Sequence, residues 1–464
     1  MGKKRATFII FGGTGDLTKR KLVPAFAGLV ADGVIDKRST IIGIGRRDQT
    51  DDSYRTLLVS SANTTVEKKV VSEANIKYYQ RDSTVPGALA ELESVIKSAE
   101  PKLGSERVFY LATSYTLFPK IIANLKSAGL DKTIGMHKPK VVFEKPFGHN
   151  YESALALEKK IHAVFSEDQV YRIDHYLGKE TVQNINILKF TNPFIKAIMN
   201  KDFVDYIDIF SDETLGVGER LGYYDGVGAT KDMIQSHLLQ VLSLVLMGEP
   251  KSFDGSGIHD AKAKVLKKIR ILPKQYQIVG QYESLEAEFK AQDMEKSNTE
   301  TFVRMGVECT SRRWRGVKCF LQSGKKLSKK SSKIIIYLKR PNDIVTSAFG
   351  GIEENKIIID IQPDEDVKIY FNTRKPFSKN TVRTVPMDFC GACHFGTNTT
   401  DGYKVLLRDV LLDDKTLFTR YDELRYSWRI VDSFLAMKSS LMMHTYKDGA
   451  SAFDVVKKCR LKQK

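Results

Sequence analysis

Short apolar runs alternate with amphipathic stretches over the first 180 residues, a pattern typical of parallel sheets whose strands are joined by helices. Strands are expected at residues 7–11, 40–45, 108–112 and 140–143, and helices at 17–29, 119–127 and 151–165, the last capped by Asn150. A strand, a tight turn, a helix and a second strand within about 40 residues form a βαβ unit. The pattern therefore predicts an N-terminal α/β domain over residues 1–180.

Beyond about residue 182 the runs become longer, and polar and apolar residues alternate in several of them. Strands are expected at 185–190, 205–210, 301–308, 333–338 and 356–361, and one long helix at 230–247. Such alternation is typical of antiparallel strands with one covered face. We therefore predict that residues 181–464 form an α+β domain with a large, mainly antiparallel sheet.

The most apolar run of the chain, Leu238–Met247, has ten residues and is interrupted by Gln240 and Ser243. A helix needs about 20 apolar residues to cross a bilayer, so we expect no membrane association. After Met1 the sequence Gly-Lys-Lys-Arg-Ala is followed closely by the apolar run Phe8–Phe11, which leaves no room for the hydrophobic region of a secretory signal. We therefore expect a cytoplasmic protein.

The 464 residues include 73 Lys and Arg against 56 Asp and Glu, which gives a net charge of +17. Such an excess favours anionic partners, whether nucleic acid, a membrane surface or phosphorylated small molecules. The lysines at 325–333 are separated by small polar residues, whereas a platform for nucleic-acid bases needs aromatic side chains. We therefore interpret this tract as a solvated face and expect no nucleic-acid partner.

Five cysteines stand at 309, 319, 390, 393 and 459, and this small, odd number is typical of a reducing compartment. Cys390-Gly-Ala-Cys393-His394 matches the C-x-x-C-H pattern of covalent haem attachment, but the sequence shows no export signal. A zinc site would need four ligands, and no second Cys/His pair lies nearby in the sequence. We favour a loop with two thiols and expect no metal, with the haem interpretation as the alternative.

A glycine-rich turn joins the first strand to the first helix, and its residues are Gly12, Gly13, Thr14, Gly15, Asp16 and Leu17. Glycines let the backbone approach a pyrophosphate, and a helix N-terminus offers unpaired N–H groups. The second strand ends in Arg46-Arg47 rather than in the acidic residue that binds the ribose of NAD. Because a guanidinium pairs with a 2′-phosphate, we expect a Rossmann domain that binds NADP, with Arg46 at that phosphate.

Three further segments carry groups suited to acid–base chemistry or to anion binding. Lys145 stands two residues after a predicted strand, residues 172–180 place His175 and Lys179 around a tyrosine, and His237 lies near the start of a strongly apolar helix. Each segment also has an ordinary structural interpretation: a solvated strand end, a polar surface and a buried core histidine. The residues alone leave these alternatives open.

At residues 174–180 the sequence Asp-His-Tyr-Leu-Gly-Lys-Glu resembles the signature of the glucose-6-phosphate dehydrogenase family. Segments similar to that family follow the same order at 12–17, 20–22, 144–148, 213–216, 223–225, 314–317, 323–327, 361–363 and 416–423. The resemblance extends over nearly the whole chain. It implies an NADP-dependent enzyme that oxidises glucose 6-phosphate to 6-phosphogluconolactone, the first step of the oxidative pentose phosphate pathway.

The resemblance also implies roles for individual residues. His237 is similar to the general base that takes the proton of the C1 hydroxyl, and Asp174 to the carboxylate that orients this base. The residues implied at the 6-phosphate are His175, Tyr176, Lys179, Lys325 and Lys330. Those implied at the sugar are Glu213, Asp232, Gln362 and Lys145, of which Lys145 would also contact NADP. A homodimer or homotetramer formed through the sheet of the second domain is implied as well, and we expect one NADP per chain.

Two alternatives stay open at the level of the sequence. A sugar dehydrogenase of the glucose–fructose oxidoreductase type would share the Rossmann domain and a Lys-Pro after a strand, but it would not need the phosphate-binding His175, Tyr176 and Lys179. A nucleic-acid-binding protein that keeps a dehydrogenase fold would account for the net charge of +17. The choice between these classes depends on the site.

Overall fold

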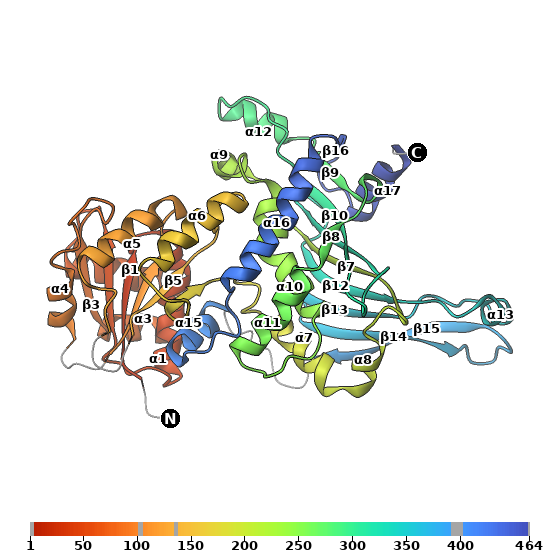
Figure 1. Cartoon of the computed structure of the whole chain (residues 1–464), viewed down its shortest axis with the longest axis horizontal. Coiled ribbons are helices and arrows are strands. Elements are labelled where there is room, and N and C mark those ends of the chain that lie inside the picture. The colour runs from red at the N-terminus through yellow and green to blue at the C-terminus, as the bar shows by residue number, and fades with distance from the viewer. Residues whose placement is uncertain (1–3, 101–104, 134–137, 391–401, 463–464) are drawn as a thin grey trace. The chain divides into compact units, whose positions relative to one another are not determined.

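The computed structural model describes residues 4–100, 105–133, 138–390 and 402–462. The chain forms two compact units (Figure 1): residues 1–178, 251–259 and 400–425 make up the first, and residues 179–250, 260–399 and 426–464 the second. Among the described residues, no helix combines the length and the apolar character that crossing a bilayer requires.

Six parallel strands form the sheet of the first unit, in the order β3-β2-β1-β4-β5-β6. These are β1 (Ala6–Phe11), β2 (Thr40–Gly45), β3 (Asn75–Gln80), β4 (Glu106–Leu111), β5 (Lys140–Phe143) and β6 (Val170–Arg172). This strand order is that of a dinucleotide-binding Rossmann fold. The predicted fold class of the N-terminal part is therefore confirmed.

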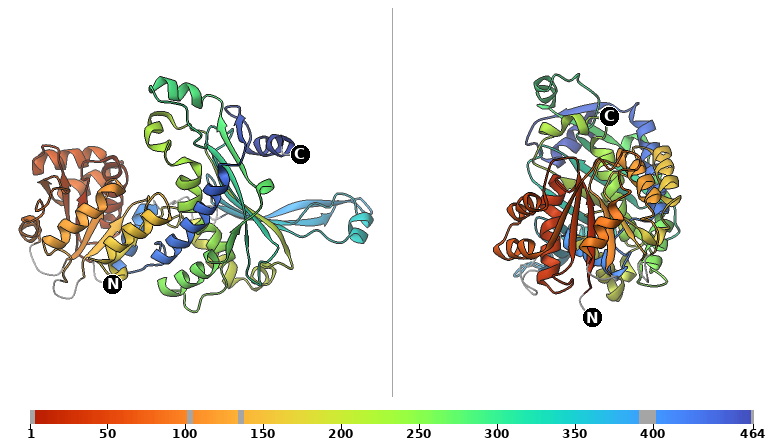
Figure 2. Two further views of the ribbon diagram at one scale, coloured as in Figure 1. Left: turned by 45° about the horizontal axis from the view of Figure 1, so that its top comes forward. Right: turned by 90° about the vertical axis from the view of Figure 1, so that its left-hand side faces the viewer.

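Helices cover both faces of this sheet (Figure 2). They are η1 (Thr18–Leu22), α1 (Val23–Ala31), α2 (Asp51–Ser61), α3 (Thr65–Glu73), α4 (Leu92–Ala99), η2 (Tyr115–Leu117), α5 (Phe118–Ser127), α6 (Tyr151–His162), η3 (Glu167–Gln169) and α15 (Gly402–Leu412). All residues of β1 and β4 are buried, as expected for parallel strands covered on both sides. Asn150 caps α6 as predicted, because its side chain accepts a 2.9 Å hydrogen bond from Ser153 N.

One helix of the first unit comes from far along the chain. The apolar side of α15 joins the core that packs against the sheet, through Leu406, Leu407, Val410 and Leu411. Lys140, the first residue of β5, donates to the carbonyl oxygens of Val410 (2.9 Å) and Leu411 (3.4 Å). A cation at a helix C-terminus satisfies carbonyls that have no intrahelical partner. The attachment of α15 thus depends on contacts that no local pattern in the sequence predicts.

The second unit is built on a ten-stranded sheet whose main order is β15-β14-β13-β12-β7-β11-β10-β9-β16, with β8 paired to β10. Its strands are β7 (Val204–Asp212), β8 (Ile269–Ile271), β9 (Ile278–Tyr282), β10 (Phe302–Cys309), β11 (Lys318–Gly324), β12 (Ser331–Leu338), β13 (Lys356–Gln362), β14 (Asp366–Arg374), β15 (Val382–Cys390) and β16 (Met443–Tyr446). β7 runs parallel to β11 and β16 parallel to β9, and the other described pairs are antiparallel. The prediction of a large, mainly antiparallel sheet is confirmed.

Helices connect these strands (Figure 1). They are α7 (Glu180–Thr191), α8 (Pro193–Ile198), η4 (Gly218–Arg220), α9 (Leu221–Tyr224), η5 (Thr230–Leu238), α10 (Leu239–Leu246), η6 (Lys274–Tyr276), α12 (Leu285–Ala291), α13 (Asp343–Ala348) and α17 (Ala452–Lys462). Two more, α11 (Gly255–Leu266) and α16 (Tyr421–Lys438), contain residues of both units.

The strand predicted at residues 185–190 is wrong, because this segment lies within the helix α7. Its buried residues include Val182, Ile185 and Lys189, whose spacing of three and four follows one face of a helix. Ile187, which a strand would place on the same face as Ile185, is 60% exposed. A short apolar run does not distinguish a strand from a helix by itself.

The helix predicted at residues 230–247 is present in two parts, η5 and α10. η5 has wide π-type turns, and the N–H of Leu239 bonds to the carbonyl of Ile234, five residues earlier. η1, which follows the glycine turn, has the same geometry, with Val23 N bonded to Thr18 O. Turns of this kind are rare and occur often at functional sites.

Lys189 stabilises the end of α10. Its ammonium group is buried and donates to the carbonyl oxygens of Leu244 (3.1 Å), Val245 (2.7 Å) and Met247. Replacement by methionine keeps the apolar stem but leaves these buried acceptors without their donor. We expect Lys189→Met to lower the free energy of unfolding by about 1–3 kcal/mol, measured by urea denaturation.

The matched control is Lys196→Met, which removes a lysine of the neighbouring helix α8. Lys196 forms an exposed ion pair with Glu249 at 2.6 Å, and such pairs contribute about 0–1 kcal/mol. Equal losses of stability in the two variants would contradict the assigned role of Lys189.

Candidate functional site

The glycine turn lies at the carboxyl edge of the first sheet. The N–H groups of Gly12 and Gly13 each donate to the carbonyl of Ile44 at 3.0 Å. A Cβ atom at Gly12, where φ is +85°, would stand 2.6 Å from Ala112 O, and one at Gly13 would stand 2.7 Å from Gly43 Cα. No larger residue fits this close packing without a shift of the backbone. The close packing of these glycines therefore fixes the turn at the carboxyl edge of the sheet, where parallel sheets bind dinucleotides.

The remaining residues of the turn lead into η1. Gly15 N donates to Gly12 O at 2.9 Å, and Thr18 Oγ1 donates to the same carbonyl at 3.0 Å. Leu17 packs against the core of the unit, whereas Asp16 is exposed beside Lys19 at 3.2 Å. The start of a helix directed at this edge provides N–H groups for an anion.

Arg46 directly follows β2, the neighbour of β1 in the sheet. The register pairs Phe11 with Ile44, so Arg46 leaves β2 at the edge that carries the glycine turn. Its side chain is exposed, and a Cβ atom built at Gly45 would lie 3.8 Å from Thr14 Oγ1. Within the first unit, the end of β2 and the glycine turn thus lie close together, and the role of Arg46 stays a prediction.

Lys145 and Asp174 follow the two neighbouring strands β5 and β6. Phe143 is paired with Arg172 in the register, so both segments leave the sheet at the same edge as the glycine turn. Asp174 is 3% exposed, and its Oδ1 accepts a 2.9 Å hydrogen bond from Tyr176 N. The rings of His175 and Tyr176 are in contact, with centroids 5.1 Å apart.

A buried ion-pair network holds the end of β6. Arg172 is fully buried, and its guanidinium donates to Glu158 Oε1 and to Glu167 Oε1, each at 2.8 Å. Burial opposes ionisation of Glu167, but the charge of Arg172 lowers the pKa of this carboxyl below its ordinary value. His162 hydrogen-bonds Glu167 at 2.9 Å. Because the guanidinium of Arg172 already pairs with both carboxylates, we interpret this Glu–His–Glu group as a structural anchor rather than a metal site.

In the second unit, Lys179 and Gln362 are joined directly. Lys179 Nζ donates to Gln362 Oε1 at 2.6 Å, and Gln362 Nε2 donates to Ser332 Oγ at 2.8 Å. Ser332 is in turn hydrogen-bonded to Ser211 at 2.9 Å. This chain of contacts links the start of α7 to β13, β12 and β7, so it fixes the ammonium group of Lys179.

Glu213 and Lys325 form an ion pair. Glu213 follows β7 and Lys325 follows β11, and Glu213 N donates to Gly324 O at 2.8 Å. Lys325 Nζ also lies 5.3 Å from the centroid of the Tyr224 ring. Burial, and then the charge of Asp232 among others, raises the pKa of Tyr224 well above its ordinary value. Glu213, Asp232 and Lys325 thus lie around the buried hydroxyl of Tyr224. The sequence predicted no role for this tyrosine.

His237 is fully buried in η5, the helix that begins two residues before Asp232. The first turn of η5 is attached to the segment that leads into β10, because Thr230 N donates to Glu300 Oε1 at 3.0 Å. Lys330, by contrast, is exposed, and among the described residues no hydrogen bond or ion pair joins it to Glu213 or Lys325. Cys390 ends β15, while Cys393 and His394 lie outside the described residues.

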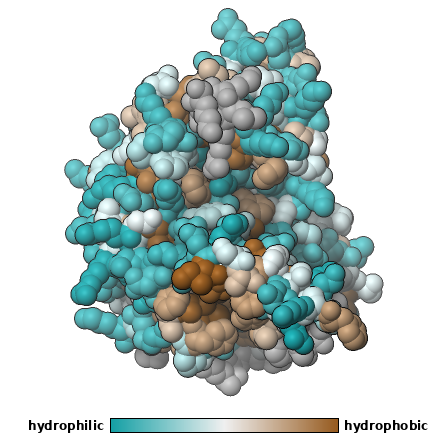
Figure 3. Space-filling view, turned by 90° about the vertical axis from the view of Figure 1, so that its right-hand side faces the viewer, coloured by the Kyte–Doolittle hydropathy of each residue, from teal (hydrophilic) through white to brown (hydrophobic). Residues whose placement is uncertain are grey.

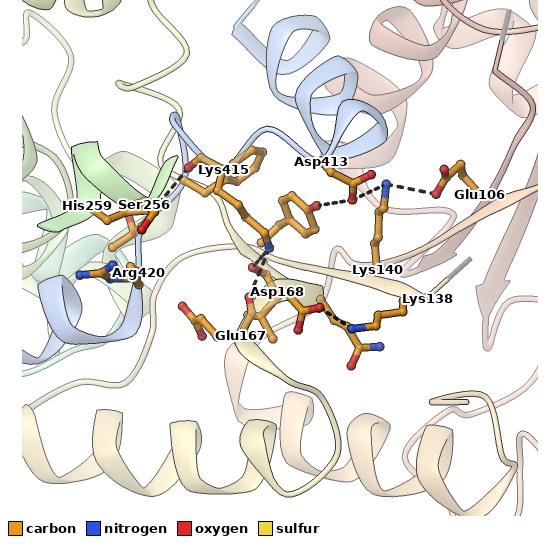
Figure 4. A pocket seen from close by; sticks show the side chains of 15 residues that line it. Glu106, Lys138, Lys140, Glu167, Asp168, Ser256, His259, Asp413, Lys415 and Arg420 are labelled. Carbon is orange, nitrogen blue, oxygen red and sulfur yellow. Dashed lines mark hydrogen bonds and ion pairs between the residues drawn. The ribbon is translucent and has the colours of Figure 1, made fainter. Parts of the chain in front are cut away.

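A cavity of about 630 Å³ opens at the opposite, amino edge of the first sheet (Figure 4). Its charged groups pair with one another: Lys138 with Asp168 at 2.8 Å, and Lys140 with Glu106 at 3.1 Å and Asp413 at 2.9 Å. Lys415 Nζ lies 3.3 Å from the centroid of the Tyr171 ring. Since these charges are satisfied within the chain and none of the predicted site residues borders the described cavity, it is not the functional site.

Comparison with known proteins agrees with this arrangement. The family model described as "Glucose-6-phosphate dehydrogenase, NAD binding domain" matches residues 9–184, and the model of the C-terminal domain of the same enzyme matches residues 186–462. Glucose-6-phosphate 1-dehydrogenase of Bacillus subtilis is 36% identical over 448 residues, which cover 92% of this chain and 91% of that protein. The enzyme of Borreliella burgdorferi is 37% identical, with coverage of 91% and 90%.

Solved structures lead to the same family. A glucose-6-phosphate dehydrogenase in complex with glucose 6-phosphate superposes with a TM-score of 0.89 at 29% identity and covers 98% of each chain. Glucose-6-phosphate 1-dehydrogenase from Mycobacterium avium has a TM-score of 0.81 at 30% identity, with coverage of 96% and 95%. A 3-ketoreductase from Actinomadura kijaniata, with a TM-score of 0.51 at 10% identity, shares the fold alone. The chain belongs to the glucose-6-phosphate dehydrogenase family.

Proposed function

We propose that this chain is the NADP-dependent oxidoreductase that converts glucose 6-phosphate to 6-phosphogluconolactone in the oxidative pentose phosphate pathway. The observation that carries the proposal is the match of both family models, which together extend from residue 9 to residue 462. The residues of the site are compatible with it, because cations and carboxylates suit a sugar with a phosphate at one end.

The first unit binds NADP in this proposal. The glycine turn Gly12–Leu17 and the start of η1 bind the pyrophosphate, and Arg46 pairs with the 2′-phosphate. Lys145 contacts both the cofactor and the sugar. NADP supplies the hydride acceptor at C4 of its nicotinamide, while the protein positions the two reactants and tunes their electrostatics. We expect one NADP per chain.

The acid–base step is assigned to His237 and Asp174. A neutral imidazole has a suitable pKa to accept the proton of the C1 hydroxyl near neutral pH. Asp174 orients this imidazole and stabilises the imidazolium that forms. The burial of Asp174 and its bond from Tyr176 N support the role, because they fix the carboxylate. The ammonium group of Lys145 stabilises the charge that develops on the sugar oxygen as the proton leaves.

The substrate is held at both ends. The 6-phosphate is bound by His175, Tyr176 and Lys179 together with Lys325 and Lys330. Glu213 and Asp232 accept hydrogen bonds from sugar hydroxyls. Gln362 lies on the substrate side, where it accepts a hydrogen bond from Lys179. The 2.6 Å bond between Lys179 and Gln362 supports this assignment, since it limits the motion of a side chain that is otherwise rich in rotamers.

The proposal is tested by the rate of NADP reduction with glucose 6-phosphate and with free glucose. Charge-assisted hydrogen bonds to a phosphate contribute about 1.5–3 kcal/mol each, so we expect kcat/KM to be at least about 100-fold higher for the phosphorylated sugar. A preference for free glucose would favour the glucose–fructose oxidoreductase type instead. Specific binding in a nucleic-acid filter assay at physiological salt would favour the nucleic-acid interpretation.

Arg46 is expected to set the choice between NADP and NAD. In Arg46→Ala the 2′-phosphate loses its guanidinium partner, so the ratio of kcat/KM for NADP to that for NAD should fall by about 10- to 100-fold. Steady-state kinetics with both cofactors measures this ratio. Arg38→Ala is the matched control, because Arg38 is an arginine of the same unit paired with Asp36 at 2.6 Å. An unchanged ratio in Arg46→Ala would contradict the assignment.

We further propose that the chain is a homodimer or homotetramer formed through the sheet of the second unit. Large apolar side chains are exposed on α13 and on the outer strands β14 and β15, among them Ile344, Phe371, Met387 and Phe389. Figure 3, which faces this side, shows apolar side chains gathered among polar ones. Exposed apolar patches of this kind are typical of protein–protein interfaces. Light scattering of the purified protein measures the oligomeric state.

We place the protein in the cytoplasm, a reducing compartment. Cys309, Cys319 and Cys459 are buried and form no disulfide bond, and burial raises the pKa of Cys319 well above its ordinary value. Buried cysteines without disulfide bonds are consistent with reducing conditions.

A further inference from the structure

The carboxyl group of Glu144, the residue before Lys145, is hydrogen-bonded to two tyrosine hydroxyls. Glu144 is the residue between β5 and Lys145, and Tyr110 of β4 donates from its hydroxyl to Glu144 Oε1 at 2.5 Å. The hydroxyl of Tyr403, near the start of α15, is hydrogen-bonded to the same carboxyl. Three elements that are distant in sequence, β4, β5 and α15, therefore meet at one side chain of the first unit.

Burial and the neighbouring side chains have opposite effects on the pKa of Glu144. Burial raises the pKa of Glu144 above its ordinary value, while the hydrogen bonds from Tyr110 and Tyr403 and the charge of Lys145 act in the opposite direction. Burial and the proximity of Glu144 hold the pKa of Tyr110 far above its ordinary value, so this phenol stays a donor. From η1, Lys21 Nζ lies 6.0 Å from the centroid of the Tyr403 ring.

We propose that Glu144 is a positioning residue: its ionised carboxylate, held by Tyr110 and Tyr403, fixes the end of β5 and holds the ammonium group of Lys145 in the orientation that catalysis needs. The carboxylate attracts the ammonium of the next residue, and the backbone N–H of Lys145 is hydrogen-bonded to it. The inference rests on the proposed contact of Lys145 with sugar and cofactor. Beyond that contact, it assigns Glu144 a role of its own: its carboxylate must be ionised for full activity.

The sign of the pH effect follows from the neighbours. When the pH falls and Glu144 is protonated, the phenols lose a charged acceptor and Lys145 loses its anionic neighbour, so activity falls. His237 must also be deprotonated to act as a base. The acid limb of log kcat/KM against pH should therefore approach a slope of two in the wild type. With Glu144→Gln, which keeps the shape but cannot ionise, the slope should fall to one.

Removal of one phenol supplies a second, milder test. In Tyr403→Phe the ionised carboxylate has one donor fewer, so the inflection that belongs to Glu144 should move to higher pH by about one unit, the effect of a single hydrogen bond to a charged group. The plateau of kcat should stay within about twofold of the wild type. Tyr171→Phe is the matched control, since the Tyr171 hydroxyl donates to Asp413 Oδ1 at 3.2 Å, at the amino edge of the sheet.

The experiment consists of pH profiles of kcat/KM for glucose 6-phosphate in the four proteins, together with infrared titration of the protonated carboxyl band of Glu144. The infrared band needs no substrate, so it follows the ionisation of Glu144 even if the chain does not oxidise glucose 6-phosphate. A band that is lost in Glu144→Gln and shifted in Tyr403→Phe, with the expected change of slope, supports the inference. The inference is overturned if the infrared band changes in Glu144→Gln and Tyr403→Phe but the acid limb of the pH profile stays the same in both. It is also overturned if the acid limb shifts as much in Tyr171→Phe as in Tyr403→Phe.

Discussion

Replacement of His237 by asparagine should lower kcat for NADP reduction by about 10²–10⁴-fold, the contribution of a general base. Asparagine keeps much of the size of the imidazole but cannot take the proton of the C1 hydroxyl. KM for glucose 6-phosphate should change little, because we assign the binding of the phosphate to other residues. Absorbance of NADPH formed at saturating substrate measures kcat, and a thermal unfolding curve shows whether the variant is folded.

The expectation has a matched control on the same helix. Ser236 is the neighbour of His237, and its hydroxyl donates to Lys231 O at 3.2 Å within η5. Ser236→Ala should therefore keep kcat within about threefold if only the imidazole matters, since surface-type substitutions of this kind rarely disturb the fold. Normal turnover in folded His237→Asn would remove His237 from the mechanism.

Replacement of Lys179 by methionine should raise KM for glucose 6-phosphate by about 10- to 100-fold, with a much smaller change in kcat. The side chain keeps its apolar stem but loses the charged donor that we propose for the phosphate, an interaction of about 1.5–3 kcal/mol. The same variant should have little effect on the weak oxidation of free glucose, which carries no phosphate. Comparison of the two sugars thus separates lost anchoring from general damage.

Gln362→Leu tests how Lys179 is held. It removes the acceptor of the 2.6 Å bond from Lys179 Nζ but leaves the ammonium group itself in place. The variant also removes the donor to Ser332 Oγ. Because the ammonium group of Lys179 remains and only its orientation is affected, the rise in KM should be smaller than in Lys179→Met, about two- to fivefold. An equal rise in both variants would mean that Gln362 itself contacts the sugar phosphate. No rise in Lys179→Met would exclude Lys179 from the phosphate site.

The elements of the first unit were predictable because their signals are local. The apolar runs of β1 and β4 are buried throughout, and the side chain of Asn150 caps α6 as the sequence indicates. Gly12 and Gly13 of the turn could likewise be recognised in the sequence, and their positions leave no room for a Cβ atom. The strand expected at 185–190 is part of a helix, because a short apolar run is compatible with the period of a strand as well as with that of a helix. Contacts distant in sequence, such as the hydrogen bonds from Lys189 to α10, favour the helix.

The candidate site was predictable only in part. The resemblance at residues 174–180 and 144–148 pointed to the residues that carry the proposed chemistry, and both segments do lie at the carboxyl edge of the first sheet. Tyr224, Tyr403 and Glu144 had no assigned role, because nothing in their local sequence indicates a buried polar contact. Hydrogen bonds between residues hundreds of positions apart, such as the bond of Glu144 with Tyr403, have no local signature.

The amino-acid sequence by itself determined the alternation of strands and helices, the glycine-rich turn after the first strand and the presence of a large second sheet, because backbone periodicity and glycine sterics act over a few neighbouring residues. Only the tertiary structure decided that residues 400–425 join the first unit and that Lys179 meets Gln362 across 183 positions. The physical reason is that such contacts form when separate apolar faces are buried together, and burial depends on the whole fold rather than on any one segment.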